Sequence, residues 1–278
     1  MNTPKIDAYA FLKKVREQKP IVHHLTNWVT IYDCANIVKA FGASPVMAHA
    51  PEEAAQMSSI ASSLVLNIGT LTADFVEAMK LAAKSANRKG IPIILDACGA
   101  GATEFRDRKS FELLDQVKIA VIKGNVSEIC RLAGKNVATK GVDAGLVEED
   151  LEKIATALAK ERKAIVVITG KSDIVADANN LCRVNNGVEM LTHVVGTGCM
   201  AASVIGTFCA VSKDLLGASA AGLSCFGIAA ELAAKQSRGP ASFKEKLFDC
   251  VFNLSRQSVE KKQKIEFFPR LVVEWERT

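Results

Sequence analysis

The sequence predicts an α/β protein in which helices cover both faces of a central, mostly parallel sheet. Four short apolar runs have the length and the β-branched content of buried strands: residues 63–68 (SLVLNI), 91–96 (IPIILD), 119–123 (IAVIK) and 164–169 (AIVVIT). Helical patterns lie between these runs, and loops rich in Gly, Asn or Thr follow them. Nearly continuous apolar strands that alternate with helices are typical of parallel sheets buried on both faces.

The remaining elements follow from the same periodicities. Residues 1–20 interrupt their apolar positions with charges, which indicates an amphipathic first helix and not a secretion signal. Residues 74–90 carry apolar side chains at helical spacing and end in a glycine. The later segments predict a hairpin-like excursion at the sheet edge over residues 173–177, 180–184 and 188–191, and then helices over residues 199–210, 215–235 and 243–264.

Composition limits the class of protein. The chain has 278 residues, 49% of them hydrophobic, and shows no internal repeat or linker, so we expect one domain over residues 1–278. The net charge of +5 comes from basic residues scattered along the chain, which argues against a nucleic-acid partner. Residues 215–234 are long enough for a membrane span, but they are rich in Ala, Gly and Ser and contain Glu231, so we expect a buried helix. The eight cysteines form no C-x-x-C pair, which indicates free thiols and a cytoplasmic protein.

Glycines and small polar residues follow all four predicted strands, in residues 67–72, 96–103 and 124–128 and at Gly170. Ligands of parallel sheets bind beyond the carboxyl ends of the strands, so we expect the functional site there. Glycine-rich turns let backbone N–H groups approach a phosphate, although tight turns require the same residue types by themselves. The clustering at four strand ends favours a phosphate-bearing ligand.

Two acidic residues, Asp96 and Glu128, end or follow neighbouring strands, so their carboxylates could converge on a divalent cation. Mg²⁺ takes one or two carboxylates, and water and substrate phosphates complete its coordination. Alternatively, Asp96 caps a helix and Glu128 is a first-turn acid that the helix dipole stabilises. These two residues alone leave both interpretations open.

Residues 194–203 (VVGTGCMAAS) place a thiol where a glycine-rich turn begins an apolar helix. Gly196, Thr197 and Gly198 would expose backbone N–H groups that can hold the charge of a phosphoryl group during transfer. Cys199 would face the acceptor, with a pKa lowered by the helix N-terminus, and could accept a proton or act as a nucleophile. The alternative is a small thiol that only packs at this position.

The segment 23–48 has the polar and apolar side chains of a small-molecule site. Met47 offers a soft apolar contact suited to a sulfur-containing ring. His23 and His24 have no partner at metal-ligand spacing, so we expect ordinary polar residues at a strand end. Four polar residues recur at helical spacing, which predicts that they share one face of a helix: Asn27, Thr30, Asp33 and Asn36.

Six segments of the chain resemble the hydroxyethylthiazole kinase family of the ribokinase-like superfamily. The resemblance runs from about residue 20 to at least residue 210, in matching order and spacing. The segments are HHLTNWVTIYDCANIVKAFGASPVMA (23–48), LNIGTL (66–71), LDACGAGATEFR (95–106), GNVSEI (124–129), KGVD (140–143) and GTGCMAAS (196–203).

The resemblance implies a three-layer α/β/α ribokinase-like fold and an enzyme of the thiamine pathway. The implied reaction is the ATP-dependent phosphorylation of the primary hydroxyl of 4-methyl-5-(2-hydroxyethyl)thiazole with Mg²⁺, in homotrimers whose thiazole sites lie between subunits. Position by position, it implies substrate contacts at Met47 and Gly196, with Asn27 in the same segment as Met47. It implies ATP contacts at Lys123 and Thr169, with Asn125 beside them, and Cys199 matches a family cysteine where most of the superfamily has an aspartate base.

Three residues at two places in the sequence depart from the family pattern. The family usually has LDPVGAG at residues 95–101, whereas this chain has Ala97 and Cys98 in the turn after Asp96. The family usually has arginine where Lys123 stands, and a lysine keeps the charge but not the planar fork that binds two oxygens at once.

Three other functions are open at this stage. One is a related kinase for hydroxymethylpyrimidine or pyridoxal, against which the segment with Asn27 and Met47 argues. Another is a transferase or hydrolase in which Cys199 is the nucleophile and His193 the base, but it leaves Asp96, Glu128 and the glycine-bearing strand ends without a role. The last is a nucleotide-binding regulator that has lost catalysis.

Overall fold

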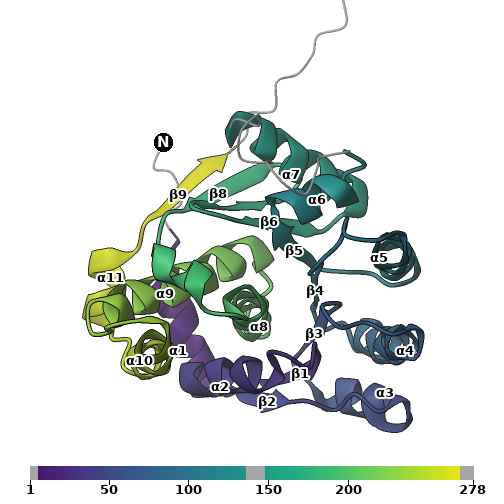
Figure 1. The fold of residues 1–278 in the computed structure, drawn as a ribbon, viewed down its shortest axis with the longest axis horizontal. Coiled ribbons are helices and arrows are strands. Elements are labelled where there is room, and N and C mark those ends of the chain that lie inside the picture. The colour runs from purple at the N-terminus through teal and green to yellow at the C-terminus, as the bar shows by residue number, and fades with distance from the viewer. Residues whose placement is uncertain (1–5, 136–147, 270–278) are drawn as a thin grey trace, which may run out of the picture.

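The computed structural model describes residues 6–135 and 148–269, so the KGVD segment at 140–143 lies outside the described residues (Figure 1). Within this part of the chain the strands form one sheet in the order β2-β1-β3-β4-β5-β6-β7-β8-β9. The strands β1 to β6 run parallel to one another. Strands β7, β8 and β9 follow β6 at one edge of the sheet, and each runs antiparallel to its neighbour. Their bounds are β1 Ile21–Leu25, β2 Ser44–Val46, β3 Ser63–Asn67, β4 Ile93–Asp96, β5 Val121–Asn125, β6 Ile165–Thr169, β7 Asp173–Ala176, β8 Asn180–Val184 and β9 Ile265–Pro269.

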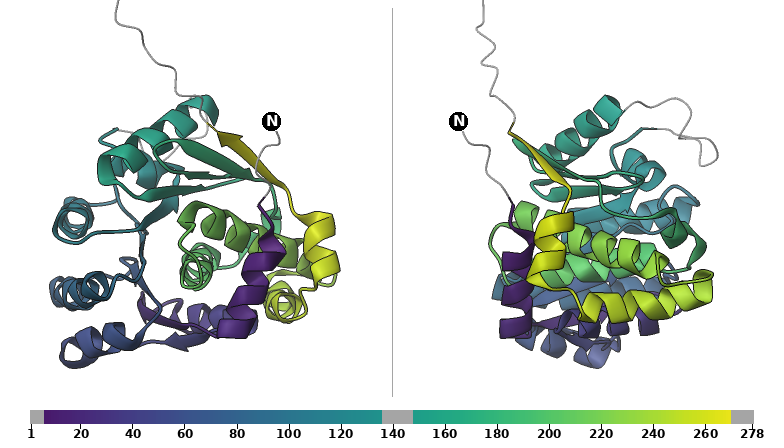
Figure 2. Two further views of the ribbon diagram at one scale, coloured as in Figure 1. Left: turned by 180° about the vertical axis from the view of Figure 1, so that it is seen from behind. Right: turned by 90° about the vertical axis from the view of Figure 1, so that its left-hand side faces the viewer.

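Helices cover both faces of this sheet (Figures 1 and 2). One face carries α1 (Ala8–Gln18), α2 (Ile31–Phe41), α8 (Thr197–Cys209), α9 (Leu215–Ala234), α10 (Pro240–Phe252) and α11 (Arg256–Lys262). The other carries α3 (Pro51–Ile60), α4 (Ala73–Lys89), α5 (Glu104–Gln116), α6 (Val126–Leu132) and α7 (Glu148–Arg162). The predicted three-layer arrangement with a mostly parallel sheet is confirmed.

The alternation of side chains along the strands produces the two cores. In β3, Leu64 and Leu66 pack with the helices of one face, whereas Val65 between them packs with those of the other. Successive strand residues point to opposite faces, so a strand buried on both sides must be apolar at every position. This explains why the central strands appear in the sequence as unbroken apolar runs.

Local signals set the ends of the predicted helices. The Thr72 hydroxyl accepts a hydrogen bond from the backbone N–H of Phe75 and begins α4. Gly90 ends α4 in the left-handed conformation, with φ of 78° and its N–H bonded to the carbonyl of Ala86. The first helix begins in the same way, because the Asp7 carboxylate caps α1.

Three predictions about elements are wrong. Residues 188–191 are not a strand, because Glu189–His193 form a short 3₁₀ helix (η2) and β9 pairs with β8 instead. The helix expected over 243–264 is interrupted after Phe252, since Ser255 caps a new helix, α11. His23 and His24 lie inside β1 and are buried, not at a strand end.

Hydrogen bonds compensate for the burial of His23. Its Nδ1 lies 2.9 Å from the Ser58 hydroxyl and its Nε2 lies 2.6 Å from the carbonyl oxygen of Ala48. Burial lowers the pKa of His24 to about 4, so its imidazole is neutral at physiological pH. These side chains break the apolar pattern of β1, which is why the sequence did not predict this strand.

Helix α9 is long and apolar enough to cross a membrane, but 83% of its most apolar window is buried inside the protein. It packs against α8 and α10, as expected for a core helix. Helix α8 in turn lies against β1, β3 and β4, and this contact brings its first turn toward the ends of those strands.

Phe208 of α8 tests the importance of this packing. Its ring is fully buried and meets Phe41 edge-on with ring centroids 5.4 Å apart. Phe208→Ala is expected to lower the free energy of unfolding by about 3–5 kcal/mol because it leaves a cavity. The matched control Phe252→Ala removes a ring that is 71% exposed, and it is expected to cost about 0.5 kcal/mol or less in urea unfolding. Equal losses in the two variants would contradict this role for α8.

Candidate functional site

The candidate site lies at the carboxyl ends of the parallel strands, where the first turn of α8 meets them. Asn27 follows β1, Asp96 ends β4, and Lys123 in the middle of β5 pairs with Asp96 in the sheet. Contacts with Asn27 and Lys123 place Cys199 and Gly198 of α8 beside these residues. The structure therefore brings together Asn27, Asp96, Lys123 and the 196–199 segment, which the sequence connects only by motif.

A glycine with an unusual backbone conformation begins α8. Gly196 has φ of 92°, which L side chains rarely adopt, and a Cβ there would lie 2.6 Å from Thr30 Cγ2. The first intrahelical hydrogen bond runs from the N–H of Met200 to the carbonyl of Gly196 at 2.8 Å. Helix geometry leaves the N–H groups of Thr197, Gly198 and Cys199 without intrahelical acceptors, while the binding of an anion by this turn stays a prediction.

Polar groups surround the buried thiol of Cys199. Asn27 Nδ2 donates to Cys199 Sγ at 3.3 Å. A hydrogen bond from the Cys98 thiol, helped by Thr30 and by the charge of Lys123, lowers the pKa of Cys199 to about 5 although burial opposes the shift. The same hydrogen bond raises the pKa of Cys98 well above its usual range. Cys199 is therefore expected to be a thiolate at neutral pH.

An ion pair is buried beside this thiol. Lys123 Nζ lies 3.0 Å from Asp96 Oδ1, and both residues are less than 5% exposed. Burial raises the pKa of Asp96, and the positive charge of Lys123 opposes that shift. Burial also disfavours the charged form of Lys123, but Asp96 and Glu128 outweigh it and raise the pKa of the ammonium. Lys123 Nζ is 3.3 Å from the point that a Cβ at Gly198 would occupy, so the absence of a side chain there lets the ammonium approach the first turn of α8.

Glu128 and Asn125 form a capping box at the start of α6. Asn125 Oδ1 accepts from the N–H of Glu128 at 2.9 Å, and Glu128 Oε2 accepts from the N–H of Asn125 at 2.7 Å. Glu128 Oε1 also accepts from the N–H of Gly99 at 2.8 Å. Glu128 lies in the first turn of α6, as the alternative to a metal ligand expected. That alternative is wrong for Asp96, because Thr103 and not Asp96 caps the following helix α5. The metal-ligand role of both residues stays a prediction. In residues 6–135 and 148–269, no cluster of three or more His, Cys, Asp or Glu side chains is arranged for a metal ion.

Thr169 and Met47 both lie at the carboxyl ends of parallel strands. Thr169 ends β6 opposite Asn125 of β5, and its hydroxyl donates to the carbonyl of Gly124 at 3.3 Å. Met47 follows β2 and is partly exposed. Their roles toward ATP and substrate stay predictions.

The segment after β1 differs from its prediction. Helix α2 begins only at Ile31, so Asn27 and Thr30 precede it and do not share a helical face with Asp33. The Asn27 side chain instead folds back, and its Oδ1 accepts from the N–H groups of Val29 and Thr30 at 3.1 Å. Asp33 pairs with Lys244 of α10 at 2.7 Å and is not directed to the site.

His193 does not serve as a base for Cys199 in this arrangement. It lies exposed in η2, and within the described part of the chain it makes no hydrogen bond to that thiol. The interpretation of Cys199 as a nucleophile paired with His193 therefore lacks its geometry.

Two further residues organise the site, although the sequence did not single them out. Asn67 ends β3 and contacts both Asn27 and Asp96. Arg106 of α5 donates to the carbonyl oxygens of Ile68, Cys98 and Gly69 at 2.8, 3.1 and 2.8 Å, so it ties two strand-end loops together. Both residues lie inside the motif segments, but only the pairing of the strands shows what they hold.

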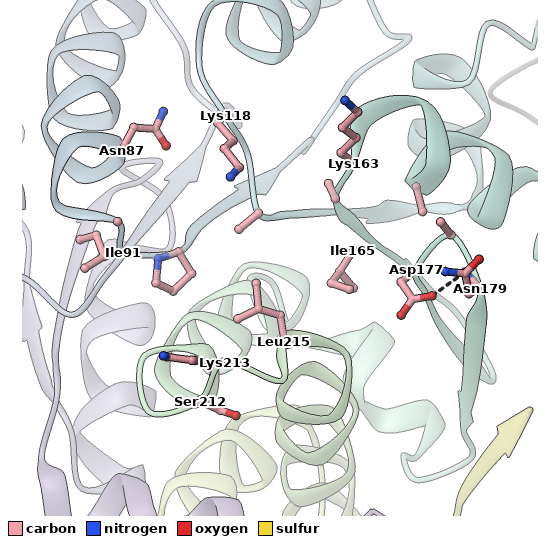
Figure 3. A pocket seen from close by; sticks show the side chains of 16 residues that line it. Asn87, Ile91, Lys118, Lys163, Ile165, Asp177, Asn179, Ser212, Lys213 and Leu215 are labelled. Carbon is pink, nitrogen blue, oxygen red and sulfur yellow. Dashed lines mark hydrogen bonds between the residues drawn. The ribbon is translucent and has the colours of Figure 1, made fainter. Parts of the chain in front are cut away.

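A cavity of about 700 Å³ lies at the amino ends of the parallel strands, around the residues that precede β4, β5 and β6. Figure 3 shows the side chains of Lys118, Lys163 and Lys213 around Ile165 and Leu215. None of the predicted site residues lines this cavity. It is therefore separate from the candidate site.

Comparison with known proteins gives a consistent relationship. The profile of the "Hydroxyethylthiazole kinase family" matches residues 12–257. A hydroxyethylthiazole kinase of Methanosarcina mazei is 54% identical over 255 residues, which cover 92% of this chain and 98% of that protein.

Solved structures agree. The hydroxyethylthiazole kinase protein of Pyrococcus horikoshii OT3 has a TM-score of 0.87 and 41% identity, with 94% of this chain and 98% of that chain covered. A ribokinase-like superfamily protein of Enterococcus faecalis has a TM-score of 0.60 at 14% identity over 90% of each chain, which shows a shared fold only. The ribokinase-like fold is therefore confirmed.

Gly196→Ala tests the first turn of α8. At Gly196 the added Cβ combines a left-handed backbone with the contact at Thr30. At Gly90 φ is 78°, but the added Cβ would have no atom of the described residues within 4 Å apart from its chain neighbours. Gly90→Ala is expected to cost about 1–2 kcal/mol in urea unfolding. Gly196→Ala is expected to cost about 1–3 kcal/mol more from overpacking. Thr30→Ala should relieve part of that difference, and identical losses at the two glycines would show that the contact is unimportant.

The protonation of Cys199 gives a second prediction. Because its pKa is lowered to about 5, the thiolate form is present at neutral pH and is lost as the pH falls through that value. The rate of iodoacetamide alkylation of Cys199, measured by peptide mass spectrometry, should therefore stay nearly constant from about pH 8 to about pH 6. An ordinary thiol, with a pKa of about 8.5, loses its thiolate form over this range. A rate that rises about tenfold per pH unit between pH 6 and pH 8 would mean that the thiol is not activated.

Proposed function

The chain belongs to the hydroxyethylthiazole kinase family, and from this premise we propose that it transfers the γ-phosphoryl group of ATP to the primary hydroxyl of 4-methyl-5-(2-hydroxyethyl)thiazole, in thiamine biosynthesis or salvage. One observation of the site carries the proposal: the activated Cys199 thiol and the ammonium of Lys123 meet at the free N–H groups that begin α8. This arrangement supplies a proton acceptor and an anion-binding turn at one point, as phosphoryl transfer requires.

The proposed reaction is an in-line displacement. The substrate oxygen bonds to the γ-phosphorus while the bond from phosphorus to the bridging oxygen of ADP breaks. Cys199 Sγ accepts the hydroxyl proton, because its lowered pKa makes it a thiolate at neutral pH. The N–H groups of Thr197 and Gly198 and the ammonium of Lys123 hold the negative charge of the phosphoryl group during transfer.

The donor set fits Mg²⁺. Asp96 and Glu128 supply hard carboxylate oxygens, and Glu128 Oε1 accepts from the N–H of Gly99 in the turn that follows Asp96. Each carboxylate oxygen keeps acceptor capacity beyond the hydrogen bond that it accepts. When bound, Mg²⁺ would neutralise phosphate charge there. Lys123, Asn125 and Thr169 then provide the contacts to ATP.

The thiazole is proposed to lie near Met47, Asn27 and Gly196, between subunits of a homotrimer. Exposed apolar side chains beside the site support such a subunit contact, since Trp28, Tyr32 and Val195 are 49%, 75% and 73% exposed. Trp28 also stacks against Phe75, with ring centroids 5.6 Å apart. The free state of all eight cysteines supports a cytoplasmic enzyme.

The direct test is ADP release with Mg·ATP on hydroxyethylthiazole, hydroxymethylpyrimidine and pyridoxal, with and without EDTA. The proposal expects turnover on the thiazole alone and its loss with EDTA. Turnover on another alcohol, or ATP binding without turnover on any, would contradict it.

Substitutions in the first turn of α8 sharpen that test. Gly198→Val is expected to abolish turnover, because its side chain would occupy the space within 3.3 Å of Lys123 Nζ. Cys199→Asp should keep measurable turnover if the residue is the proton acceptor, whereas Cys199→Ala should lower kcat by about 100-fold or more. Full activity in Gly198→Val would remove the anion-binding turn from the mechanism.

A further inference from the structure

Asn67 lies between the two halves of the proposed site. It ends β3 and is 1% exposed. Its Oδ1 accepts from Asn27 Nδ2 and from the N–H of Gly69, each at 2.9 Å, and its Nδ2 donates to Asp96 Oδ2 at 2.6 Å. One side chain thus contacts the residue that holds Cys199 and the carboxylate paired with Lys123.

Backbone groups fix the direction of both amides. The N–H of Gly69 can only donate, so Asn67 must turn its oxygen toward it and its NH₂ group toward Asp96. The N–H groups of Val29 and Thr30 identify the oxygen of Asn27 in the same way, so its NH₂ group is the end that faces Cys199 and Asn67. Asn67 Oδ1 accepts from that NH₂ group and holds it in place. The two amides therefore present donors to Cys199 Sγ and to Asp96 Oδ2.

The site leaves little room for another residue at position 67. A Cβ on Gly69 would lie only 3.0 Å from Asn67 Oδ1, which shows how closely this loop folds over the amide. An aspartate would replace the donor to Asp96 with a second negative charge. An apolar side chain would leave the N–H of Gly69 and the amide of Asn27 without their acceptor.

We propose that Asn67 is a positioning residue for phosphoryl transfer. It holds Asn27 in its contact with Cys199, and it holds Asp96 in its ion pair with Lys123. In this role it acts through these neighbours and not by contact with a reactant. The proposal rests on the proposed function for its kinetic consequence, but the arrangement itself is a property of the chain.

Steady-state kinetics on the full chain with Mg·ATP and hydroxyethylthiazole test the proposal. Asn67→Ala and Asn67→Asp are expected to lower kcat about 10- to 100-fold, the effect of losing a hydrogen bond to a charged group, with both KM values changed about threefold or less. Ser63→Ala is the matched control on β3, since its buried hydroxyl has no hydrogen-bond partner among the described residues, and it should leave kcat unchanged.

A double-mutant cycle separates positioning from a general loss of structure. Because Asn67 acts on Cys199 through Asn27, the kcat loss in Asn27→Ala/Asn67→Ala should be smaller than the product of the single losses. Unchanged kcat in Asn67→Ala, or fully multiplicative losses that follow the fraction of unfolded protein, would overturn the proposal.

A structural readout keeps this result independent of the reaction. In a crystal structure of Asn67→Ala, Asn27 Nδ2 should have left hydrogen-bond distance of Cys199 Sγ, whereas Ser63→Ala should keep the contact at 3.3 Å. An unmoved Asn27 would overturn the positioning role. A wild-type protein without thiazole turnover would instead contradict the proposed function and leave this structural test valid.

Discussion

The buried ion pair between Asp96 and Lys123 is the constraint on which the site depends. Removing two charges from water is costly, and the attraction between them compensates only when other polar groups complete their hydrogen bonding. Here Asn67 donates to the second oxygen of Asp96, and the carboxylate of Glu128 adds negative charge near the ammonium. The pair fixes the ends of β4 and β5 and presents a positive charge to the first turn of α8.

Close packing of α8 against the sheet makes that approach possible. A Cβ at Gly206 would lie 2.5 Å from Val65 Cγ2, so the middle of the helix can lie directly on β3 only because this residue is glycine. Glycines allow close contacts at the start of the helix too, where Gly196 lies against Thr30 and Gly198 lies beside Lys123. Gly206 thus lets α8 lie close to the sheet, with Cys199 in its first turn within hydrogen-bond distance of Asn27.

Much of this arrangement could be predicted from the sequence. The central strands are apolar at every position, and the residues after them meet at one edge because parallel strands share a direction. Strand β1 was missed because His23 and His24 are buried through specific hydrogen bonds, which no hydropathy pattern reveals. Asn67 was quoted within a motif but not recognised, since its partners lie 40 and 29 residues away and become neighbours only through the pairing of strands. Cys98 was noticed as a departure from the family pattern, but its hydrogen bond to Cys199 needed the fold.

The central claim is that the acceptor hydroxyl and the transferred phosphoryl group meet at Cys199 and the first turn of α8. A crystal structure of the protein with hydroxyethylthiazole, Mg²⁺ and a non-hydrolysable ATP analogue tests it most directly. The account predicts the substrate hydroxyl within hydrogen-bond distance of Cys199 Sγ, and the terminal phosphate at the N–H groups of Thr197 and Gly198 beside Lys123. A hydroxyl directed away from Cys199, or a terminal phosphate bound elsewhere, would contradict it.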